Sequence, residues 1–459
     1  MAGIGFQLKK MLAADNYIGL FGAYAYAGII TSGPWIIAII TILALTLLTQ
    51  SVVNNVHITQ SFQSIIVYLI AGSLILSSVF HHSYTRFIAD IFYKKNYDLI
   101  LPTLNGIYTV MLLVAFVVGF IAVNLLIPNE THFVKGLIIS CFTILNLIWI
   151  TTSVMSGLLA YRTIFSAFLV SFIISISSGF FLHKYGLSGL LFSFMSGEFM
   201  LLMILVNTVY RFYPSDELVR FDFFTSSLVK KILIFSGLFY NVGIWIDKFI
   251  FWYHPLTGIR VIGHLSQSLI YDTPIFMAYL AVIPGTITFL MHMETEFADA
   301  YEEFYDYVRG DNTFNEINHA YHKLIYAGRD ALNSIIKSQL YLILLTITLG
   351  STVFYVIHIS FIYLPLFYIC FIAASLNVIF WAALDIVFYL DKIYLATFLS
   401  GFFMLSNALL TWLSISLGIL YFGYGLLASL LLTVMLSFFI LNYEIRHLKY
   451  ETYMLTPIA

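Results

Sequence analysis

Charged residues are scarce in this chain. Aspartate, glutamate, lysine and arginine make up only 10% of its 459 residues, whereas 61% of the residues are hydrophobic. An ordinary soluble domain contains about 25% charged residues, so the composition excludes that class. Apolar runs long enough to cross a ~30 Å hydrocarbon layer recur along nearly the whole length. The sequence therefore predicts an all-α integral membrane protein.

Motifs for catalysis and for ATP use are also absent. The chain has no GxxxxGK[ST] phosphate loop, no HExxH and no GxSxG. Its two cysteines, Cys141 and Cys370, each lie in an apolar run, which favours helix packing over a disulfide or a zinc site. We therefore expect no enzymatic activity, no cofactor and no metal, and we favour transport over catalysis.

The apolar runs predict about twelve transmembrane helices. Their expected extents are 23–48, 65–82, 104–127, 136–160, 164–183, 187–209, 232–252, 272–293, 336–358, 361–384, 394–416 and 421–442. The longer connection at 210–231 separates two sets of six. We therefore expect an N-terminal six-helix bundle over 1–229 and a C-terminal six-helix bundle over 230–459.

Basic residues predict the orientation of the chain, because cytoplasmic loops carry an excess of lysine and arginine. If the N-terminus is cytoplasmic, seventeen of the twenty-one basic residues are cytoplasmic and only Lys135, Lys184 and Arg260 lie outside. The remaining one, Lys248, lies within a span. We therefore expect both termini in the cytoplasm. Residues 1–22 place apolar side chains among charges, which is typical of an amphipathic helix along the inner membrane surface.

One cytoplasmic segment, 294–335, is large enough to form structure of its own. Its first part, "ETEFADAYEEFYDYVRGD", has seven acids and one base, and it places Phe297, Tyr301, Phe304 and Val308 at helical spacing. An "RGDN" turn follows, and then a second apolar helical face. The pattern predicts an amphipathic helical hairpin. Such a hairpin either packs under its own bundle or docks a cytosolic partner.

Glu198 is the deepest carboxylate in the sixth predicted span. It is twelve residues from Gly186 and thirteen from Arg211, which is roughly 18–20 Å from either marker at 1.5 Å per residue. An unpaired carboxylate near the midplane costs at least ~2.5 kcal/mol. We interpret Glu198 either as a coupling or pathway-lining residue, or as a protonated side chain within a helix contact.

Prolines predict irregular helices at two places. Pro34 removes a backbone hydrogen bond about a third of the way along the first span, directly after Gly33. Gly33 and Pro34 are therefore a candidate hinge, although such a kink can also be purely structural. In the eighth span, Pro274 and the "IPG" of residues 283–285 indicate a similar irregularity.

The stretch "YNVGIWIDKFIFW" places polar residues in the seventh span. Asn241 is about 15 Å from the cytoplasmic edge, whereas Asp247 and Lys248 are about 24 to 26 Å from it, in the outer third. Asn241, Trp245 and Lys248 share a helix face, which lines a substrate pathway or packs against another helix. Adjacent Asp247 and Lys248 are expected not to face each other. Asp247 is instead expected to pair with a neighbouring helix or to take part in coupling.

Longer phrases carry a family resemblance over residues 1 to about 307. They are "MAGIGFQLKKML", "AYAYAGIITSGPW", "TRFIADIFYKKNYDLILP", "GLFYNVGIWIDKF" and "YDTPIFMAYLAVIPGTITFLMHMETEFADAYEEFYDY". These phrases resemble the PelG family of Pel exopolysaccharide transporters. That family is similar to the polysaccharide branch of the MOP flippase superfamily. The resemblance implies two six-helix bundles around a central cavity, as in MATE-like transporters.

The resemblance also implies a substrate and partners. The substrate would be a Pel-type amino-sugar polymer, moved outward across the bacterial cytoplasmic membrane for the biofilm matrix. The partners would be a cytosolic glycosyltransferase and membrane regulators that include a cyclic di-GMP sensor, with no nucleic acid and no cofactor. Trp245 could then stack on sugar rings. The candidate pathway residues Asn241, Trp245, Lys248 and Glu198 rest on depth and facing, not on the resemblance.

Three other functions stay open. A lipid-linked oligosaccharide flippase needs a basic cavity for pyrophosphate, which is weakly supported because only Lys248 lies within a span. A MATE-like small-molecule antiporter is kept open by Glu198 and Asp247. In the third alternative, the chain mainly anchors the polymer synthase in the membrane through the hairpin at 294–335.

Overall fold

The computed structural model describes residues 56–157, 161–225 and 231–454, together with a few isolated residues before position 56. The predicted amphipathic helix over 1–22 and the candidate hinge, Gly33 and Pro34, therefore lie outside the described residues. Most of the first predicted span does so as well.

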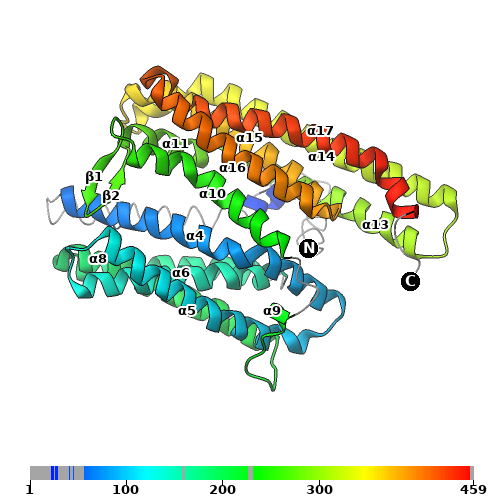
Figure 1. Ribbon diagram of the computed structural model, residues 1–459, viewed down its shortest axis with the longest axis horizontal. Coiled ribbons are helices and arrows are strands. Elements are labelled where there is room, and N and C mark those ends of the chain that lie inside the picture. The colour runs from blue at the N-terminus through cyan, green and yellow to red at the C-terminus, as the bar shows by residue number, and fades with distance from the viewer. Residues whose placement is uncertain are drawn as a thin grey trace. The chain divides into compact units, whose positions relative to one another are not determined.

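Helices dominate the described residues (Figure 1). In chain order, the elements are α4 (Val56–Tyr93), η1 (Tyr97–Leu99), α5 (Ile100–Leu126), α6 (His132–Gly157), α7 (Tyr161–Leu182), η2 (His183–Tyr185), α8 (Gly186–Phe212), α9 (Asp222–Thr225), α10 (Ile232–Tyr253), β1 (Ile259–Ile262), β2 (Leu265–Gln267), α11 (Leu269–Ala281), α12 (Ile283–His292), the π-helical turn η3 (Met293–Phe297), α13 (Ala298–Arg309), α14 (Phe314–Val356), η4 (Phe361–Tyr363), α15 (Leu364–Tyr389), α16 (Ile393–Ser416), η5 (Ile419–Tyr421) and α17 (Tyr424–Met454).

Ten helical segments among the described residues are long and apolar enough to cross a membrane. They include eleven of the twelve predicted spans, because the segment Thr163–Phe212 contains both α7 and α8. Several outward faces are apolar, and Leu113, Phe116 and Phe120 of α5 are each more than half exposed. Such a face suits lipid tails, and it would be an aggregation site in water. The prediction of an all-α, multi-pass membrane protein is confirmed.

The chain divides into two compact units. Among the described residues, unit 1 contains 246–250 and 269–454, and unit 2 contains 56–157, 161–225, 231–245 and 251–268. Helix α10 contributes to both, because its segment Ile246–Ile250 belongs to unit 1. The expected domain boundary at 229/230 stays a prediction.

Glycines allow close helix packing in unit 2. A Cβ added at Gly197 of α8 would lie 2.7 Å from the Ser171 carbonyl oxygen of α7 and would overlap the Ser175 hydroxyl. A Cβ at Gly119 of α5 would similarly lie 3.2 Å from the Phe142 ring of α6. Lipid-embedded helices gain little from hydrophobic burial against each other, so close backbone approach at small residues stabilises their contacts.

A short β-hairpin follows α10 and is fixed to α4 within unit 2. Strands β1 and β2 are antiparallel, and Gly263 supplies the positive φ of 56° that their tight turn requires. The Tyr68 hydroxyl of α4 donates a 2.9 Å hydrogen bond to the Ser266 carbonyl. The Tyr68 ring also lies 4.6 Å, centroid to centroid, from that of Trp252. These contacts hold the connection between α10 and α11 in place.

The eighth predicted span is irregular in unit 1, as expected. Pro274 lies inside α11, which ends at Ala281. Helix α12 begins directly afterwards and has Pro284 in its first turn, where the missing N–H of proline is tolerated. The π-helical turn η3 then leads into α13. The prediction of an irregular helix at Pro274 and residues 283–285 is confirmed.

A helical hairpin, α13 and α14, occupies the segment where one was predicted. Thr313 and Glu316 form a capping box at the start of α14: the Glu316 side chain accepts a 2.7 Å bond from the Thr313 N–H, and Thr313 Oγ1 accepts from the Glu316 N–H. On α13, Phe304 is fully buried. The 43 residues of α14 give it a length of about 65 Å, roughly twice a hydrocarbon layer. About half of its length therefore exceeds a layer of that thickness.

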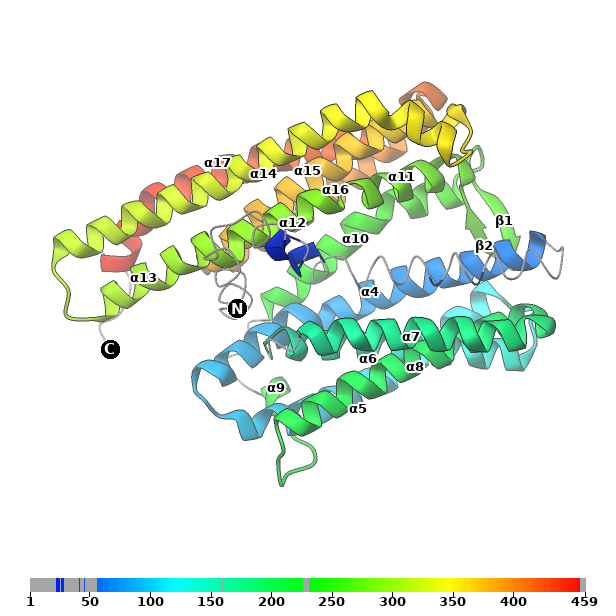
Figure 2. The ribbon, with the colours of Figure 1, turned by 180° about the vertical axis from the view of Figure 1, so that it is seen from behind.

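The beginning of α14 runs beside the end of α17, and both views show these long helices together (Figures 1 and 2). The Tyr321 hydroxyl donates a 2.9 Å hydrogen bond to the Ile445 carbonyl. The Lys449 ammonium donates a 2.5 Å hydrogen bond to Asn318 Oδ1 and lies 4.2 Å from the centroid of the Tyr321 ring. Side chains thus hold the two helix extensions together.

We predict that Gly197→Val lowers the melting temperature of the purified protein in detergent. A valine side chain would overlap α7, and overpacking of this kind costs about 1–3 kcal/mol. The matched control is Gly136→Val on α6, where a Cβ would meet nothing within 4 Å. Equal melting temperatures for both variants would contradict the close α7–α8 contact.

Candidate functional site

Two adjacent charged residues of α10, Asp247 and Lys248, are buried. Asp247 is fully buried, and Lys248 is 7% exposed. The Lys248 ammonium nitrogen lies 3.2 Å from both carboxylate oxygens of Asp247. The expectation that these neighbours do not face each other is therefore wrong. The flexible four-carbon stem of lysine folds around the helix to reach the carboxylate.

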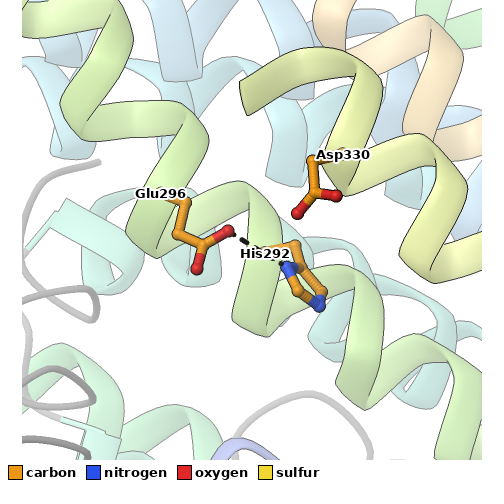
Figure 3. Close-up of side chains that lie close together, drawn as sticks. All are labelled: His292, Glu296 and Asp330. Atoms are coloured by element: carbon orange, nitrogen blue, oxygen red, sulfur yellow. Dashed lines mark ion pairs between the residues drawn. The ribbon is translucent and has the colours of Figure 1, made fainter. Parts of the chain in front are cut away.

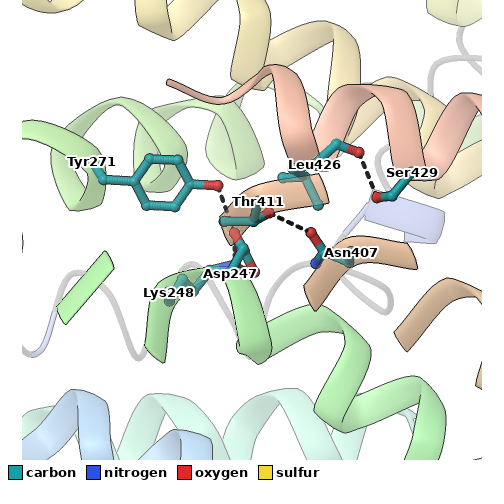
Figure 4. Close-up of polar contacts among 7 residues, drawn as sticks. All are labelled: Asp247, Lys248, Tyr271, Asn407, Thr411, Leu426 and Ser429. Carbon is teal, nitrogen blue, oxygen red and sulfur yellow. Dashed lines mark hydrogen bonds and ion pairs between the residues drawn. The ribbon is translucent and has the colours of Figure 1, made fainter. Parts of the chain in front are cut away.

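Two tyrosines of α11, Tyr271 and Tyr279, complete this cluster within unit 1. Figure 4 shows Tyr271 beside Asp247 and Lys248. The Tyr271 hydroxyl, on a fully buried side chain, donates a 2.6 Å hydrogen bond to Asp247 Oδ2. The Lys248 ammonium also lies 5.3 Å from the centroid of the Tyr279 ring, within the range of a cation–π interaction. Asp247 thus contacts a neighbouring helix, as the sequence predicted.

The contacts in this cluster stabilise the buried charges of Asp247 and Lys248. Transferring an isolated carboxylate or ammonium out of water is strongly unfavourable, so buried charges occur paired and hydrogen-bonded. Asp247 accepts hydrogen bonds from Lys248 and from Tyr271, which satisfies both of its oxygens. Removing one partner would leave an uncompensated charge, whereas removing both charges would not. Asp247 and Lys248 therefore stabilise each other in the buried state.

Small polar side chains form buried rows on α16 and α17 of unit 1. Asn407 and Thr411 of α16 are at most 1% exposed, and the Thr411 hydroxyl donates a 2.8 Å hydrogen bond to Asn407 Oδ1 (Figure 4). On α17, Ser429, Thr433 and Ser437 follow one another at four-residue spacing and are fully buried. Each of these three hydroxyls donates to a carbonyl of its own helix, as is usual in transmembrane helices.

Asn241, Trp245 and Lys248, which were predicted to share one face of α10, have different surroundings in the structure. Asn241 is half-buried, and its amide donates a 3.1 Å hydrogen bond to the Gly237 carbonyl one turn earlier. Trp245 is half-buried, and its ring centroid lies 6.5 Å from that of Trp252. Lys248 is buried and paired with Asp247. The role of these three residues in lining a substrate pathway stays a prediction.

Glu198 lies on α8 of unit 2 and is half-buried. No described residue forms an ion pair or a hydrogen bond with its carboxylate, although Cys141 of α6 is close enough for a charge on Glu198 to act on it. Its neighbour Gly197 lies against α7. Glu198 therefore occupies a helix contact of unit 2, and its role in transport stays a prediction.

A family model described as "PelG: Putative exopolysaccharide Exporter (EPS-E)" matches residues 1–453 of this sequence. The chain belongs to the PelG family. No protein with a curated description matches it.

Solved transporters of the MOP superfamily share the fold of this PelG-family chain. An inward-facing multidrug resistance MATE transporter has a TM-score of 0.62 at 10% identity, over 89% of this chain and 95% of its own. A MATE transporter in complex with MaL6 has 0.63 at 10%, over 92% and 97%. A MOP transporter from Pyrococcus furiosus has 0.60 at 12%, over 93% and 96%. Such low identities show the fold alone.

Two of the polar residues of this PelG-family protein that sequence reasoning missed lie beside the features described above. One is Tyr271, whose position could have indicated it: it directly precedes the predicted span 272–293, on the side where the predicted span 232–252 ends a few residues after Asp247. The other is Gln339 of α14, which is 1% exposed and has no hydrogen-bond partner for either amide atom among the described residues. Its amide lies against Gly285, directly after Pro284. No sequence pattern indicates that contact.

We predict that Asp247→Asn and Lys248→Met each destabilise the protein strongly and that the double variant is less destabilised than the sum of the two. Breaking one partner of a buried pair costs about 3–5 kcal/mol, whereas removing both charges can be nearly neutral. Thermal unfolding of the four proteins in one detergent measures this coupling.

Two further variants sharpen this double-mutant cycle. Tyr271→Phe should cost about 1–3 kcal/mol, because it removes one donor from a buried acceptor. Lys184→Met, at an exposed lysine, should leave the melting temperature unchanged. If Lys248→Met alone were as stable as the parent protein, the buried pair would not exist.

Proposed function

We propose that this protein moves a Pel-type amino-sugar exopolysaccharide outward across the bacterial cytoplasmic membrane, for the biofilm matrix. The observation that carries this proposal is the PelG family match over residues 1–453. The MOP fold supports it, because the solved proteins that share this fold are transporters. Both termini are proposed to be cytoplasmic, as the distribution of basic residues predicts.

The chemistry of the polar residues on α10 suits a glycan. Sugar hydroxyl and acetamido groups need hydrogen-bond donors and acceptors, and the flat faces of sugar rings stack on aromatic side chains. We assign Asn241, Trp245 and Lys248 of α10, together with Glu198 of α8, to the substrate pathway, on the basis of their depth and facing. Asp247 holds Lys248 in position and lowers the net charge that a passing sugar would meet. Gly33 and Pro34 remain the proposed hinge.

The α13–α14 hairpin is the proposed contact with the cytosolic glycosyltransferase and the membrane regulators. An open groove of about 420 Å³ on this hairpin is lined mostly by acids. The lining residues are Asp299, Glu302, Glu303, Asp306, Tyr307 and Asn312. Lys323 pairs with Glu303, and the four acids that line the groove give it a negative charge that suits a basic surface on a partner. The same groove favours a second candidate function, in which the chain mainly anchors the synthase.

We predict that deleting the gene abolishes secreted polymer and that Lys248→Ala restores secretion poorly while the protein still assembles with the glycosyltransferase. Secreted polymer and co-purification of the glycosyltransferase are measured in the same complemented strains. Secretion that survived deletion of the gene would overturn the exporter proposal. If Lys248→Ala restored secretion fully, Lys248 would not be a pathway residue.

The docking proposal predicts a different pattern. Replacing Asp299, Glu302 and Asp306 with the corresponding amides should reduce co-purification of the glycosyltransferase several-fold, because the charge of the groove is removed while the hairpin retains its shape. The matched control carries Asp98→Asn, Asp216→Asn and Asp311→Asn, three exposed acids outside the groove. Equal loss in both triple variants would contradict a specific contact.

A further inference from the structure

Three metal-ligating side chains converge where the broken helix of unit 1 meets α14 (Figure 3). They are His292 at the end of α12, Glu296 in the π-helical turn and Asp330 on α14. His292 Nδ1 lies 3.5 Å from Glu296 Oε2. One ligand atom from each side chain lies within 4.8 Å of the other two. The three side chains thus come from two separate stretches of chain and point toward one another.

Close packing brings these stretches together. A Cβ added at Gly328 of α14 would lie only 3.3 Å from the ring of Phe297, the last residue of the π-helical turn. The two elements therefore approach at Gly328, two residues before Asp330. His292 and Glu296 are four residues apart, which places them on one side of their own helix. The close approach of the two backbones therefore brings the stretches that carry the three side chains within reach of each other.

The charge of this cluster is unbalanced. Two carboxylates face one imidazole, and no described residue forms an ion pair or a hydrogen bond with Asp330. The side chains of His292 and Glu296 are 22% and 60% exposed, so an ion from the surrounding water can reach them. A divalent cation would relieve the repulsion between the carboxylates.

We propose that His292, Glu296 and Asp330 form a site for a divalent transition metal of the zinc type. Imidazole suits zinc and its neighbours in the first transition row, and carboxylates complete an N,O,O donor set. Ligand atoms bonded to Zn²⁺ at about 2.1 Å lie roughly 3.4 Å apart, so side-chain rotation alone can close the present spacing. Water would fill the remaining position. The bound metal would link the π-helical turn to α14 at the base of the α13–α14 hairpin.

The experiment uses the full-length protein without an affinity tag, purified in detergent and treated with a chelator. Zn²⁺ binding is measured by calorimetry, and Co²⁺ is titrated as a spectroscopic probe of the ligand field. One saturable ion per chain is expected, together with a rise in melting temperature, because binding to the folded state alone stabilises that state.

Ligand variants and matched controls locate the site. His292→Gln, Glu296→Gln and Asp330→Asn should each weaken binding at least about tenfold, since loss of even an outer-shell partner costs 10- to 100-fold. His319→Ala and Asp311→Asn remove an exposed histidine and an exposed acid of the same hairpin outside the cluster, and they should bind as the parent does. Glu296 is the most exposed ligand, so its variant should fold even if the others do not.

Two results would overturn the site. One is the absence of saturable binding in the parent protein. The other is unchanged Zn²⁺ affinity in Glu296→Gln and also in a second ligand variant, either His292→Gln or Asp330→Asn. That second variant must be shown to be folded, by a metal-free melting temperature equal to that of the parent. Secretion of polymer is not part of this test, so its outcome is independent of the proposed export function.

Discussion

A bilayer core offers no hydrogen-bond partners, and this constraint explains most of the described structure. A polar group there is therefore stabilised when it finds a partner within the protein. The hydroxyls of Ser429, Thr433 and Ser437 donate to carbonyls of their own helix. Asp247, which has no such option, takes hydrogen bonds from Lys248 and from Tyr271 of the next helix. The same constraint therefore explains both the hydroxyls that bond within their own helix and the hydrogen-bonded cluster on α10.

The same constraint shapes the irregular backbone of unit 1. Pro274 and Pro284 each remove a donor from the path of α11 and α12, and the π-helical turn widens the helix a few residues later. Gln339 lies against this region at Gly285, with an amide that has no partner among the described residues. A side chain that can both donate and accept thus lies next to a backbone that has lost donors.

The spans, the broken eighth helix and the hairpin could be predicted from sequence, because each depends on local properties: apolar length, proline chemistry and helical spacing. The cluster on α10 could be predicted only in part. Depth and helix face identified Asp247 and Lys248 as important, but they predicted wrongly that the two side chains do not contact each other. A helix-face argument uses only the direction of the Cα–Cβ bond, and it ignores the length and flexibility of the lysine side chain. Tyr271 is twenty-four residues away. Gly328 and Asp330 depend on tertiary contacts that no local pattern contains.

The geometry of the pair also bears on what passes through the protein. Lys248 is the only basic residue in the interior of a predicted span, because Lys337 lies at the very edge of the span 336–358. The flippase alternative would use Lys248 to bind pyrophosphate. In the structure its ammonium lies 3.2 Å from both oxygens of a fully buried carboxylate. The pair carries no net charge, so its attraction for an anion is weak at any distance beyond a few ångströms. A polymer of sugars is bound through hydrogen bonds and through stacking on flat aromatic side chains. A pair without net charge does not interfere with either kind of contact. The buried pair therefore favours glycan passage over the binding of a lipid pyrophosphate.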